Sequence, residues 1–223
     1  MHDTALALNR RLAATSLVRE ERRLPSTDWR DGLPSLKGRI VTLRELEAAD
    51  GARLLPQLTT PEVISFLSPP PASIDQFTGF IEATLRERQA GRYAAFAVVP
   101  HGHSAPVGIV QVRQLEPGFR TAEWGVALGS EWWGRGVFVD AGRLALDFAF
   151  NTLGVQRLEA RVAAQNARGN GAVQKLGAVA EGLLRSSLLV ADGTRHDQVL
   201  WAWLEEDWRR GRQAGVEAST WVH

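Results

Sequence analysis

A segment with two glycines, Glu131–Gly136, joins an apolar run to an amphipathic stretch in this chain of 223 residues. The run before it, Thr121–Leu128, has the character of a strand, and the stretch after it carries apolar residues at helical spacing to about Asn151. Glycines at a helix entrance leave main-chain N–H groups uncovered at the positive end of the helix dipole. The sequence therefore predicts a strand–loop–helix unit with an anion site, best suited to phosphate, at the loop.

The rest of the chain alternates between strand and helix signals. Further strands are predicted at residues 39–44, 93–99, 107–115, 157–163, 182–190 and 197–204, and further helices at 50–58, 61–66, 73–91 and 169–176. This order predicts an α/β protein of the α+β mixed-sheet kind, with helices on the faces of the sheet. The last strand is apolar on both sides, so we expect it to be central or covered.

Three regions are distinguished by composition. Residues 1–35 have mixed charge and end in a stretch with Pro25, Gly32 and Pro34, so we expect an N-terminal arm and linker. Residues 36–210 form the predicted domain, and residues 211–223 a C-terminal tail.

Bulk properties exclude several classes. The absence of cysteine excludes disulfides and thiolate chemistry, and a formal net charge of +1 does not indicate a nucleic-acid partner. No apolar run approaches the roughly 20 residues of a membrane span, and residues 1–11 lack a signal core, so we expect a cytoplasmic protein with no membrane partner. His101 and His103 flank a predicted turn, where a solvated loop is favoured over a metal pair, so no metal is expected.

Three classes of phosphate-bearing ligand could bind at the glycine segment. A P-loop would need Gly-x-x-x-x-Gly-Lys-Ser/Thr, and no such run exists. A dinucleotide fingerprint would need a third glycine where Val139 stands, although Glu159 lies near the spacing of a ribose-binding acid. Residues 129–133 also separate the loop from its strand, which disfavours this ligand. The third ligand is an acyl-CoA pyrophosphate.

The third ligand is favoured by a resemblance that covers about residues 36–210. In order and spacing, six pieces of the chain resemble the GNAT superfamily of N-acetyltransferases, and specifically its RimJ/RimL-like branch. The pieces are Gly38–Arg44 followed by Asp50, Thr121–Leu128, Trp132–Gly136, Arg157–Val162, Asn166–Gly177 and Asp197–Trp201. The resemblance implies a mostly antiparallel sheet that splays between its fourth strand, Thr121–Leu128, and its fifth, Arg157–Val162. Glu131 departs from the usual Gln or Arg of the loop, and we expect it to point away from the phosphates.

The same resemblance implies acetyl-CoA as co-substrate and assigns residues to it. The pyrophosphate is expected on the main-chain amides of the loop, and the pantetheine arm is expected to pair with the end of the fourth strand. Asn166 is the preferred side chain for the arm, while it also caps the next helix, and Asn170 is a second choice. The expected cofactor-binding residues are Val126, Ala127, Leu128, Trp133, Gly134, Arg135, Gly136, Val137, Asn166 and Asn170.

Catalysis in such a site needs an oxyanion donor and a proton acceptor. The main-chain N–H of Val126 is the expected donor to the thioester oxygen. Glu123 is the candidate general base, with a pKa raised by a partly apolar cleft, and a structural or substrate-orienting carboxylate is the alternative. No general acid is assigned. Val173 and Gly169 occupy the positions where relatives carry Tyr or Ser, and Tyr93 is predicted elsewhere, at an early strand start.

The predicted activity is transfer of acetyl from acetyl-CoA to a primary amine by direct attack in a ternary complex. The acceptor is a protein N-terminus or a small-molecule amine, and the sequence leaves this choice open. A non-catalytic acyl-CoA-binding module is the alternative, because the usual acids are missing. A homodimer is a further expectation, since the N-terminal arm can pack on the body or on a second subunit.

Overall fold

The computed structural model describes residues 28–68, 72–190 and 192–211. Most of the predicted arm and nearly all of the predicted tail lie outside these residues, so both domain boundaries stay predictions. Within the described residues, eight strands form one sheet in the order β1-β2-β3-β4-β5-β6-β8-β7. The strands are β1 Leu36–Lys37, β2 Val41–Glu45, β3 Tyr93–Pro100, β4 Gly108–Gln114, β5 Thr121–Leu128, β6 Arg157–Ala163, β7 Val179–Leu189 and β8 Arg195–Leu204.

The helices follow the predicted positions closely. They are α2 Gly51–Leu58, α3 Pro61–Ile64, α4 Ile74–Gln89, α5 Val137–Phe148 and α6 Ala167–Lys175, with shorter turns η1 Ala48–Asp50, η2 Pro117–Phe119, η3 Ser130–Trp132 and η4 Ala149–Leu153; residues 205–211 are also helical. Local chemistry explains several boundaries. Ser73 accepts the backbone N–H of Gln76 at the start of α4, and Pro61 occupies the first turn of α3.

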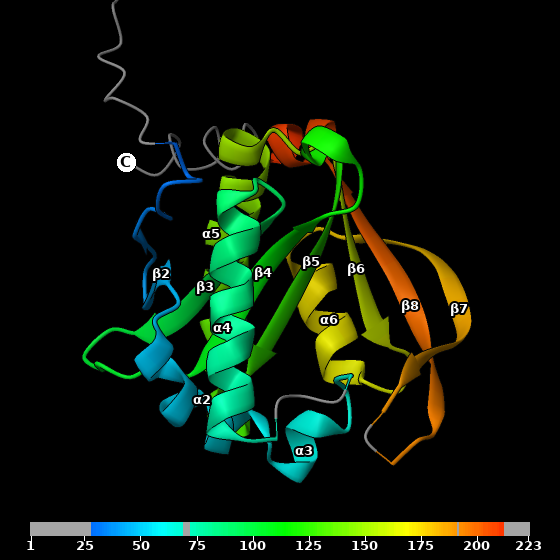
Figure 1. Cartoon of the computed structure of the whole chain (residues 1–223). Helices are drawn as coiled ribbons and strands as arrows, with labels where there is room; N and C mark the ends of the chain where they lie inside the picture. The colour runs from blue at the N-terminus through cyan, green and yellow to red at the C-terminus, as the bar shows by residue number, and fades with distance from the viewer. Residues whose placement is uncertain (1–27, 69–71, 191, 212–223) are drawn as a thin grey trace, which may run out of the picture.

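The helices cover both faces of the sheet (Figure 1). On one face, α2 and α4 pack over a cluster that includes Leu54, Phe77 and Ile81. On the other face, α5 and α6 enclose the main core, which contains Trp124, Leu146 and Trp203. The mixed α/β fold with helices on both faces is therefore confirmed. The last strand, β8, lies between β6 and β7, as its two apolar sides predicted.

Every neighbouring pair of strands is antiparallel except β5 and β6, which are parallel. Their pairing covers only three residue pairs, from Thr121 with Arg157 to Glu123 with Glu159. Beyond Glu123 the two strands diverge, and the gap is open toward the end of β5 (Figure 1). The predicted splay is confirmed.

The described part of the predicted arm packs on the body. Trp29 and Leu33 are partly buried against the main core, and the ring of Trp29 meets Phe119 edge-on at 5.6 Å between centroids. In the described ranges, no helix has both the length and the apolarity to cross a membrane.

Candidate acyl-CoA site

The glycine loop forms an exposed set of main-chain donors at the entrance of α5. Gly134 and Gly136 have φ of 74° and 80°, a left-handed conformation that a side chain would strain. Within the described chain, the N–H groups of residues 134–138 donate to no protein acceptor. They lie at the N-terminal end of a helix of 12 residues, whose dipole adds positive potential. This geometry fits a phosphate.

The Trp133 amide does not belong to this set. Its N–H donates to the Ser130 carbonyl at 3.1 Å, inside the turn η3, so its assignment as a phosphate donor is wrong. The side chain of Trp133 anchors the loop instead, because its indole N–H donates to the Leu128 carbonyl at 3.0 Å and fixes the loop to the end of β5.

Two arginines stack on the tryptophans of the loop. The guanidinium of Arg135 lies 5.4 Å from the Trp132 ring, and that of Arg168 lies 4.7 Å from the Trp133 ring. Arg168 belongs to the first turn of α6, so it brings a cation to the loop from the far side of the gap. The sequence reasoning did not single out Arg168.

Asp140 holds the entrance of α5 against the start of β2. Its carboxylate accepts the backbone N–H groups of Arg39, Ile40 and Val41 at 3.2, 2.9 and 3.1 Å. Gly38 passes so close that a Cβ there would lie 2.4 Å from Asp140 Oδ2. Since Asp140 lies in the first turn of α5, these bonds fix the direction of the helix that presents the loop.

The free edge of β5 can be read from its hydrogen bonds to β4. The N–H of Gly129 donates to Val107, and the carbonyl of Thr121 accepts from Leu115, so the odd-numbered residues of β5 face β4. Val126 is therefore directed into the gap, where its N–H and C=O have no strand partner among the described residues. Ala127 faces Ile109 in the ladder, so its assignment as a main-chain partner of the pantetheine arm is wrong. At Leu128 the carbonyl is already occupied by Trp133.

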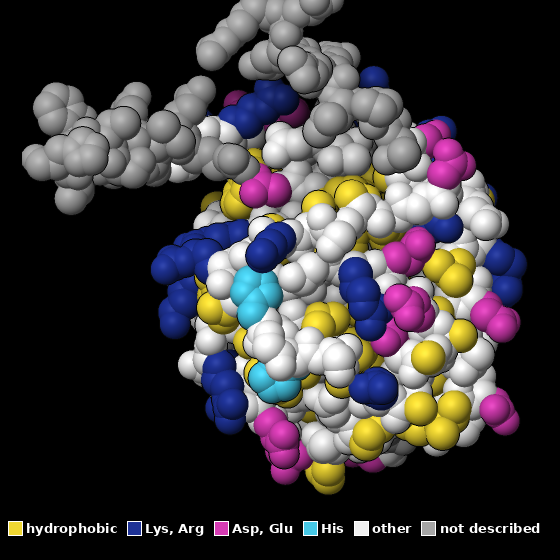
Figure 2. All heavy atoms as spheres, turned by 90° about the vertical axis from the view of Figure 1, so that its left-hand side faces the viewer, with side chains coloured by type: hydrophobic (Ala, Val, Ile, Leu, Met, Phe, Trp, Pro, Cys, Tyr) yellow, Lys and Arg dark blue, Asp and Glu magenta, His cyan; other side chains and the backbone are white. Residues whose placement is uncertain are grey.

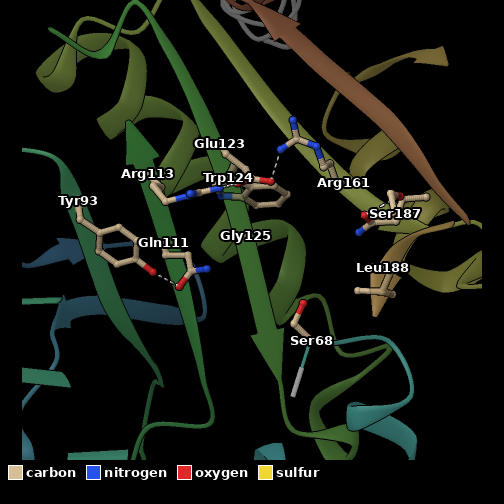
Figure 3. A pocket seen from close by; sticks show the side chains of 11 residues that line it. Ser68, Tyr93, Gln111, Arg113, Glu123, Trp124, Gly125, Arg161, Ser187 and Leu188 are labelled. Carbon is tan, nitrogen blue, oxygen red and sulfur yellow. Dashed lines mark hydrogen bonds and ion pairs between the residues drawn. The ribbon is translucent and has the colours of Figure 1, made fainter. Parts of the chain in front are cut away.

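A pocket of about 400 Å³ lies on the α4 side of the sheet, where β5 and β6 part (Figure 3). Tyr93, Arg113 and Glu123 are direct cross-strand neighbours, so their side chains share this face. The Tyr93 hydroxyl donates to Gln111, and Gln111 lies against Gly125, where a Cβ would meet its amide at 2.9 Å. The lining consists of Ser68, Tyr93, Gln111, Arg113, Glu123, Trp124, Gly125, Arg161, Ser187, Leu188 and Gln198.

Glu123 is held by two guanidinium groups in this pocket. One oxygen accepts from Arg113 and the other from Arg161. Burial acts to raise the pKa of the Glu123 carboxyl, but the hydrogen bonds and charges of Arg113 and Arg161 outweigh it and leave the pKa below its ordinary value. The predicted rise of this pKa is therefore wrong. Burial raises the pKa of the Tyr93 hydroxyl, so this phenol is protonated at neutral pH.

The two asparagines at the start of α6 differ. Asn166 accepts the backbone N–H of Gly169 at 2.8 Å, which confirms its capping role, and its amide nitrogen has no protein partner among the described residues. Asn170 donates to the carbonyls of Ala163 and Asn166 and accepts the indole N–H of Trp201 at 2.8 Å. Because these bonds use its amide group, the assignment of Asn170 to the cofactor is wrong, and its role is structural.

The acetyltransferase (GNAT) domain family matches residues 41–179, which is more than half of the chain. The chain belongs to the GNAT acetyltransferase family. It is accordingly an acyltransferase of the N-acetyltransferase class, and the predicted family and enzyme class are confirmed.

Relatives and neighbours of this GNAT chain carry related names. The "Putative ribosomal N-acetyltransferase YdaF" of Bacillus subtilis is 26% identical over 172 residues, which are 75% of this chain and 93% of the relative. The [Ribosomal protein uS5]-alanine N-acetyltransferase of Escherichia coli is 29% identical over 107 residues, 48% of this chain and 55% of the relative. The structure of Mycobacterium smegmatis RimJ in complex with CoA-disulfide has the same fold, with a TM-score of 0.71, 23% identity, and coverage of 82% of this chain and 93% of that chain.

The GNAT fold brings together residues that sequence reasoning kept apart. The sequence predicts Tyr93 elsewhere and assigns no site role to Arg113 or Arg161, yet all three line the pocket. The signal that could have found them is register: pairing β3 with β4 and β4 with β5 puts Tyr93, Arg113 and Glu123 in one row. Glu159, the candidate ribose acid of the dinucleotide alternative, pairs with Arg157 at 2.9 Å and Arg161 at 3.3 Å instead.

Proposed function

We propose that this GNAT domain transfers an acetyl group from acetyl-CoA to a primary amine in a ternary complex. The observation that carries the proposal is the parting of β5 from β6 after Glu123, which leaves Val126 with free main-chain groups between the glycine loop and the pocket. A donor that needs phosphate contacts at one end, amide pairing in the middle and a reacting carbonyl at the pocket fits this arrangement in one extended pose.

The binding residues are assigned by what each has free. The pyrophosphate lies on the amides of Gly134, Arg135, Gly136 and Val137, with Arg168 as an additional cation from α6. The pantetheine amides pair with Val126 and reach the free amide nitrogen of Asn166. Each main-chain or amide assignment uses a group that has no protein partner in the described ranges.

The reaction is a direct attack. The acceptor ammonium first gives a proton to water, and the neutral amine nitrogen then bonds to the thioester carbonyl carbon as the C–S bond breaks. The nitrogen releases a second proton to water, and the CoA thiolate takes up one proton, so that one proton is released overall. The Val126 N–H stabilises the developing oxyanion, a contribution of about 3 kcal/mol for a preorganised donor. Tyr93, protonated and in the pocket lining, is our candidate proton donor to the thiolate.

Glu123 is assigned the alternative role that the sequence left open. A carboxylate with a lowered pKa is a weak base, so we favour an orienting function, in which Glu123 receives a hydrogen bond from the amine while Arg113 and Arg161 hold it still. The general-base role stays the competing hypothesis.

The acceptor class and place of action extend the proposal. The names of the Bacillus subtilis and Escherichia coli relatives mention ribosomal proteins, which supports a protein N-terminus as acceptor and the cytoplasm as location. The face that the β2 side of the sheet presents has basic, acidic and apolar side chains interspersed (Figure 2), unlike a surface of one sign for nucleic acid. A homodimer stays a prediction, which the solution mass will test.

The decisive experiment is an acetyl-transfer assay on the full chain. Acetyl-CoA and a panel of amines and N-terminal peptides are supplied, thiol release is followed, and mass spectrometry seeks the added acetyl group on the acceptor. We expect both signals together for at least one acceptor. Tight CoA binding with no transfer to any amine would favour a non-catalytic acyl-CoA-binding module instead.

A further inference from the structure

Six charged side chains form a continuous ribbon of ion pairs on the pocket face of the sheet. Arginines and glutamates alternate along it from β4 through β5 and β6 to β7, and each contacts the next. In order they are Arg113, Glu123, Arg161, Glu159, Arg157 and Glu181. Each of the four inner members has two partners of opposite charge, whereas each end has one.

One end of this ribbon, Arg113, lines the pocket where β5 and β6 part, which is where the proposed reaction places the amine acceptor. Arg113 donates to Glu123 through Nη2, and no other ion pair or hydrogen bond of its guanidinium exists among the described residues. Its side chain is 55% exposed and lines the pocket between Tyr93 and Glu123. In Figure 3 it extends from β4 toward Glu123, in the middle of the lining. The other end, Glu181, lies on the edge strand β7, outside the pocket.

The lining therefore has unused donors for an anion. Arg113 and Arg161 are its two arginines, and Glu123, its one acidic side chain in the described residues, is shared between them. A guanidinium has five N–H donors in a fork that matches a carboxylate. An acceptor whose only charged group is an ammonium has no anion to pair with Arg113, the positively charged end of the ribbon. An acceptor that also carries a carboxylate would add one more ion pair, between this carboxylate and Arg113.

The geometry points to an acceptor that carries a carboxylate as well as its primary amine, with Arg113 binding the carboxylate. This inference rests on the proposed acetyl transfer and specifies its substrate class. Arg113 is then a specificity-determining residue: it selects among amines and takes no part in bond making. The carboxylate can belong to a small amino acid or to an acidic side chain near a peptide N-terminus, and the test separates the two sources.

The test compares acceptors that differ only in one carboxylate. The small pair is β-alanine and β-alaninamide, and the peptide pair begins with alanyl-glutamyl or alanyl-glutaminyl and is otherwise identical. For at least one pair, we expect kcat/KM of wild type to favour the acid by about tenfold or more, the size of one charged hydrogen bond. The pair that shows the preference identifies the source of the carboxylate.

Because Arg113 also holds Glu123, the variant Arg113→Gln should lower activity with both acceptors of a pair, so the readout is the acid-to-amide ratio of kcat/KM, which should fall by about tenfold or more. Dividing the acid-over-amide preference of wild type by that of Arg113→Gln cancels differences in intrinsic amine reactivity. Arg92→Gln is the matched control, because Arg92 is 54% exposed, has Glu87 as its one ion-pair partner among the described residues, and lies outside the lining. Its preference should equal that of wild type.

The outcomes are distinct. If no amine of either kind is acetylated, the proposed function fails and this inference fails with it. If amines are acetylated but acid and amide react equally in wild type, or Arg113→Gln keeps the preference, the inference alone is overturned. The wild-type peptide comparison decides even if Arg113→Gln does not fold, since the two peptides have the same N-terminal amine.

Discussion

The Asp140 carboxylate accepts the backbone N–H of Ile40 at 2.9 Å, although the two residues are 100 positions apart in the chain. The bond joins the first turn of α5 to the loop before β2, and Ile40 in turn lies beside Gly136, where a Cβ would be 3.5 Å from its Cδ1. A segment near the start of the domain thus contacts the glycine loop at Gly136 and the following helix at Asp140.

We expect Asp140→Asn to weaken acetyl-CoA binding and to lower stability by about 1–3 kcal/mol, because an amide group cannot accept three N–H groups and turns a donor toward them. KM for acetyl-CoA should rise severalfold with little change in kcat. Asp75→Asn, in the first turn of α4, is the control and should leave KM unchanged. An unchanged KM in Asp140→Asn, despite lost stability, would show that the anchor does not position the loop.

Gly136→Val should abolish most CoA binding, measured by calorimetry. Gly136 has φ of 80°, and a β-branched residue there is strained by about 1–3 kcal/mol unless the loop rearranges and moves the amides. Gly154→Val is the matched control, since Gly154 has φ of 73° and open space but lies far along the chain, after η4. Both variants should lose similar stability, and only the first should lose affinity. Equal affinity in both would refute the phosphate assignment.

Glu123→Gln tests the general-base hypothesis. If Glu123 orients the amine, the variant should lower kcat/KM while the pH–rate profile between about pH 6 and 9 keeps its shape, because a group with a lowered pKa does not titrate there. A basic limb that disappears in Glu123→Gln would reinstate Glu123 as the base.

The same variant gives a stability test with a definite sign. Because the pKa of Glu123 is lowered in the folded chain, its ionised form stabilises the fold at neutral pH, and the contribution is lost as the pH falls below the ordinary carboxyl range, near pH 4. Wild type should exceed Glu123→Gln by about 1–3 kcal/mol in unfolding free energy at pH 7. This difference in unfolding free energy should disappear by about pH 2. A difference that does not change with pH would contradict the lowered pKa of Glu123.

Tyr93→Phe should reduce kcat by about tenfold or more if the phenol protonates the departing thiolate. The affinity for CoA should not change, since Tyr93 lies on β3, away from the glycine loop. Thioester analogues with a more acidic leaving thiol should recover part of the loss. If kcat falls equally for all leaving groups, Tyr93 orients the acceptor through Gln111 and is not the proton donor.

Arg168→Gln should weaken CoA binding by about three- to tenfold, because it removes the cation that α6 brings to the loop. Arg30→Gln serves as control, since Arg30 also stacks on a tryptophan, Trp29, at 5.9 Å, but outside the loop. The loss should shrink at high salt, as a charge contact requires. Salt-independent weakening would assign Arg168 a packing role.

Local signals in the sequence were sufficient for most of the fold. The cap at Ser73, the proline at position 61 and the glycines after α4, η4 and α6 act within a few residues, so a linear pattern contains them. The position of β8 followed from its two apolar sides. The site was harder. Whether Val126 or Ala127 faces the gap depends on the phase of the β4–β5 ladder, which a one-residue shift inverts.

The electrostatic environment of the site was the hardest property to predict from the sequence. The sign of the Glu123 pKa shift is set by Arg161, 38 residues away on another strand, and by Arg113 on the opposite neighbour. Apolar neighbours in the sequence indicate burial, and burial does act to raise the pKa of Glu123. The combined effect of the two arginines is larger and lowers this pKa. In the same way, the linear pattern around Asn170 does not contain Trp201, 31 residues on, whose indole N–H donates to the Asn170 oxygen.

The edge that Val126 leaves open has a consequence for which molecules can enter. An outer sheet edge accepts a strand from any chain and is a site of aggregation, but this edge is enclosed between two strands of the same sheet. A backbone that pairs with a strand lies about 4.8 Å from it, so the proposed pairing with Val126 suits a ligand as thin as one extended polypeptide. We infer from this proposed pairing that the site selects donors by shape: a long amide-bearing arm completes the ladder at Val126, whereas a compact anion that binds only the glycine loop leaves the ladder unfinished.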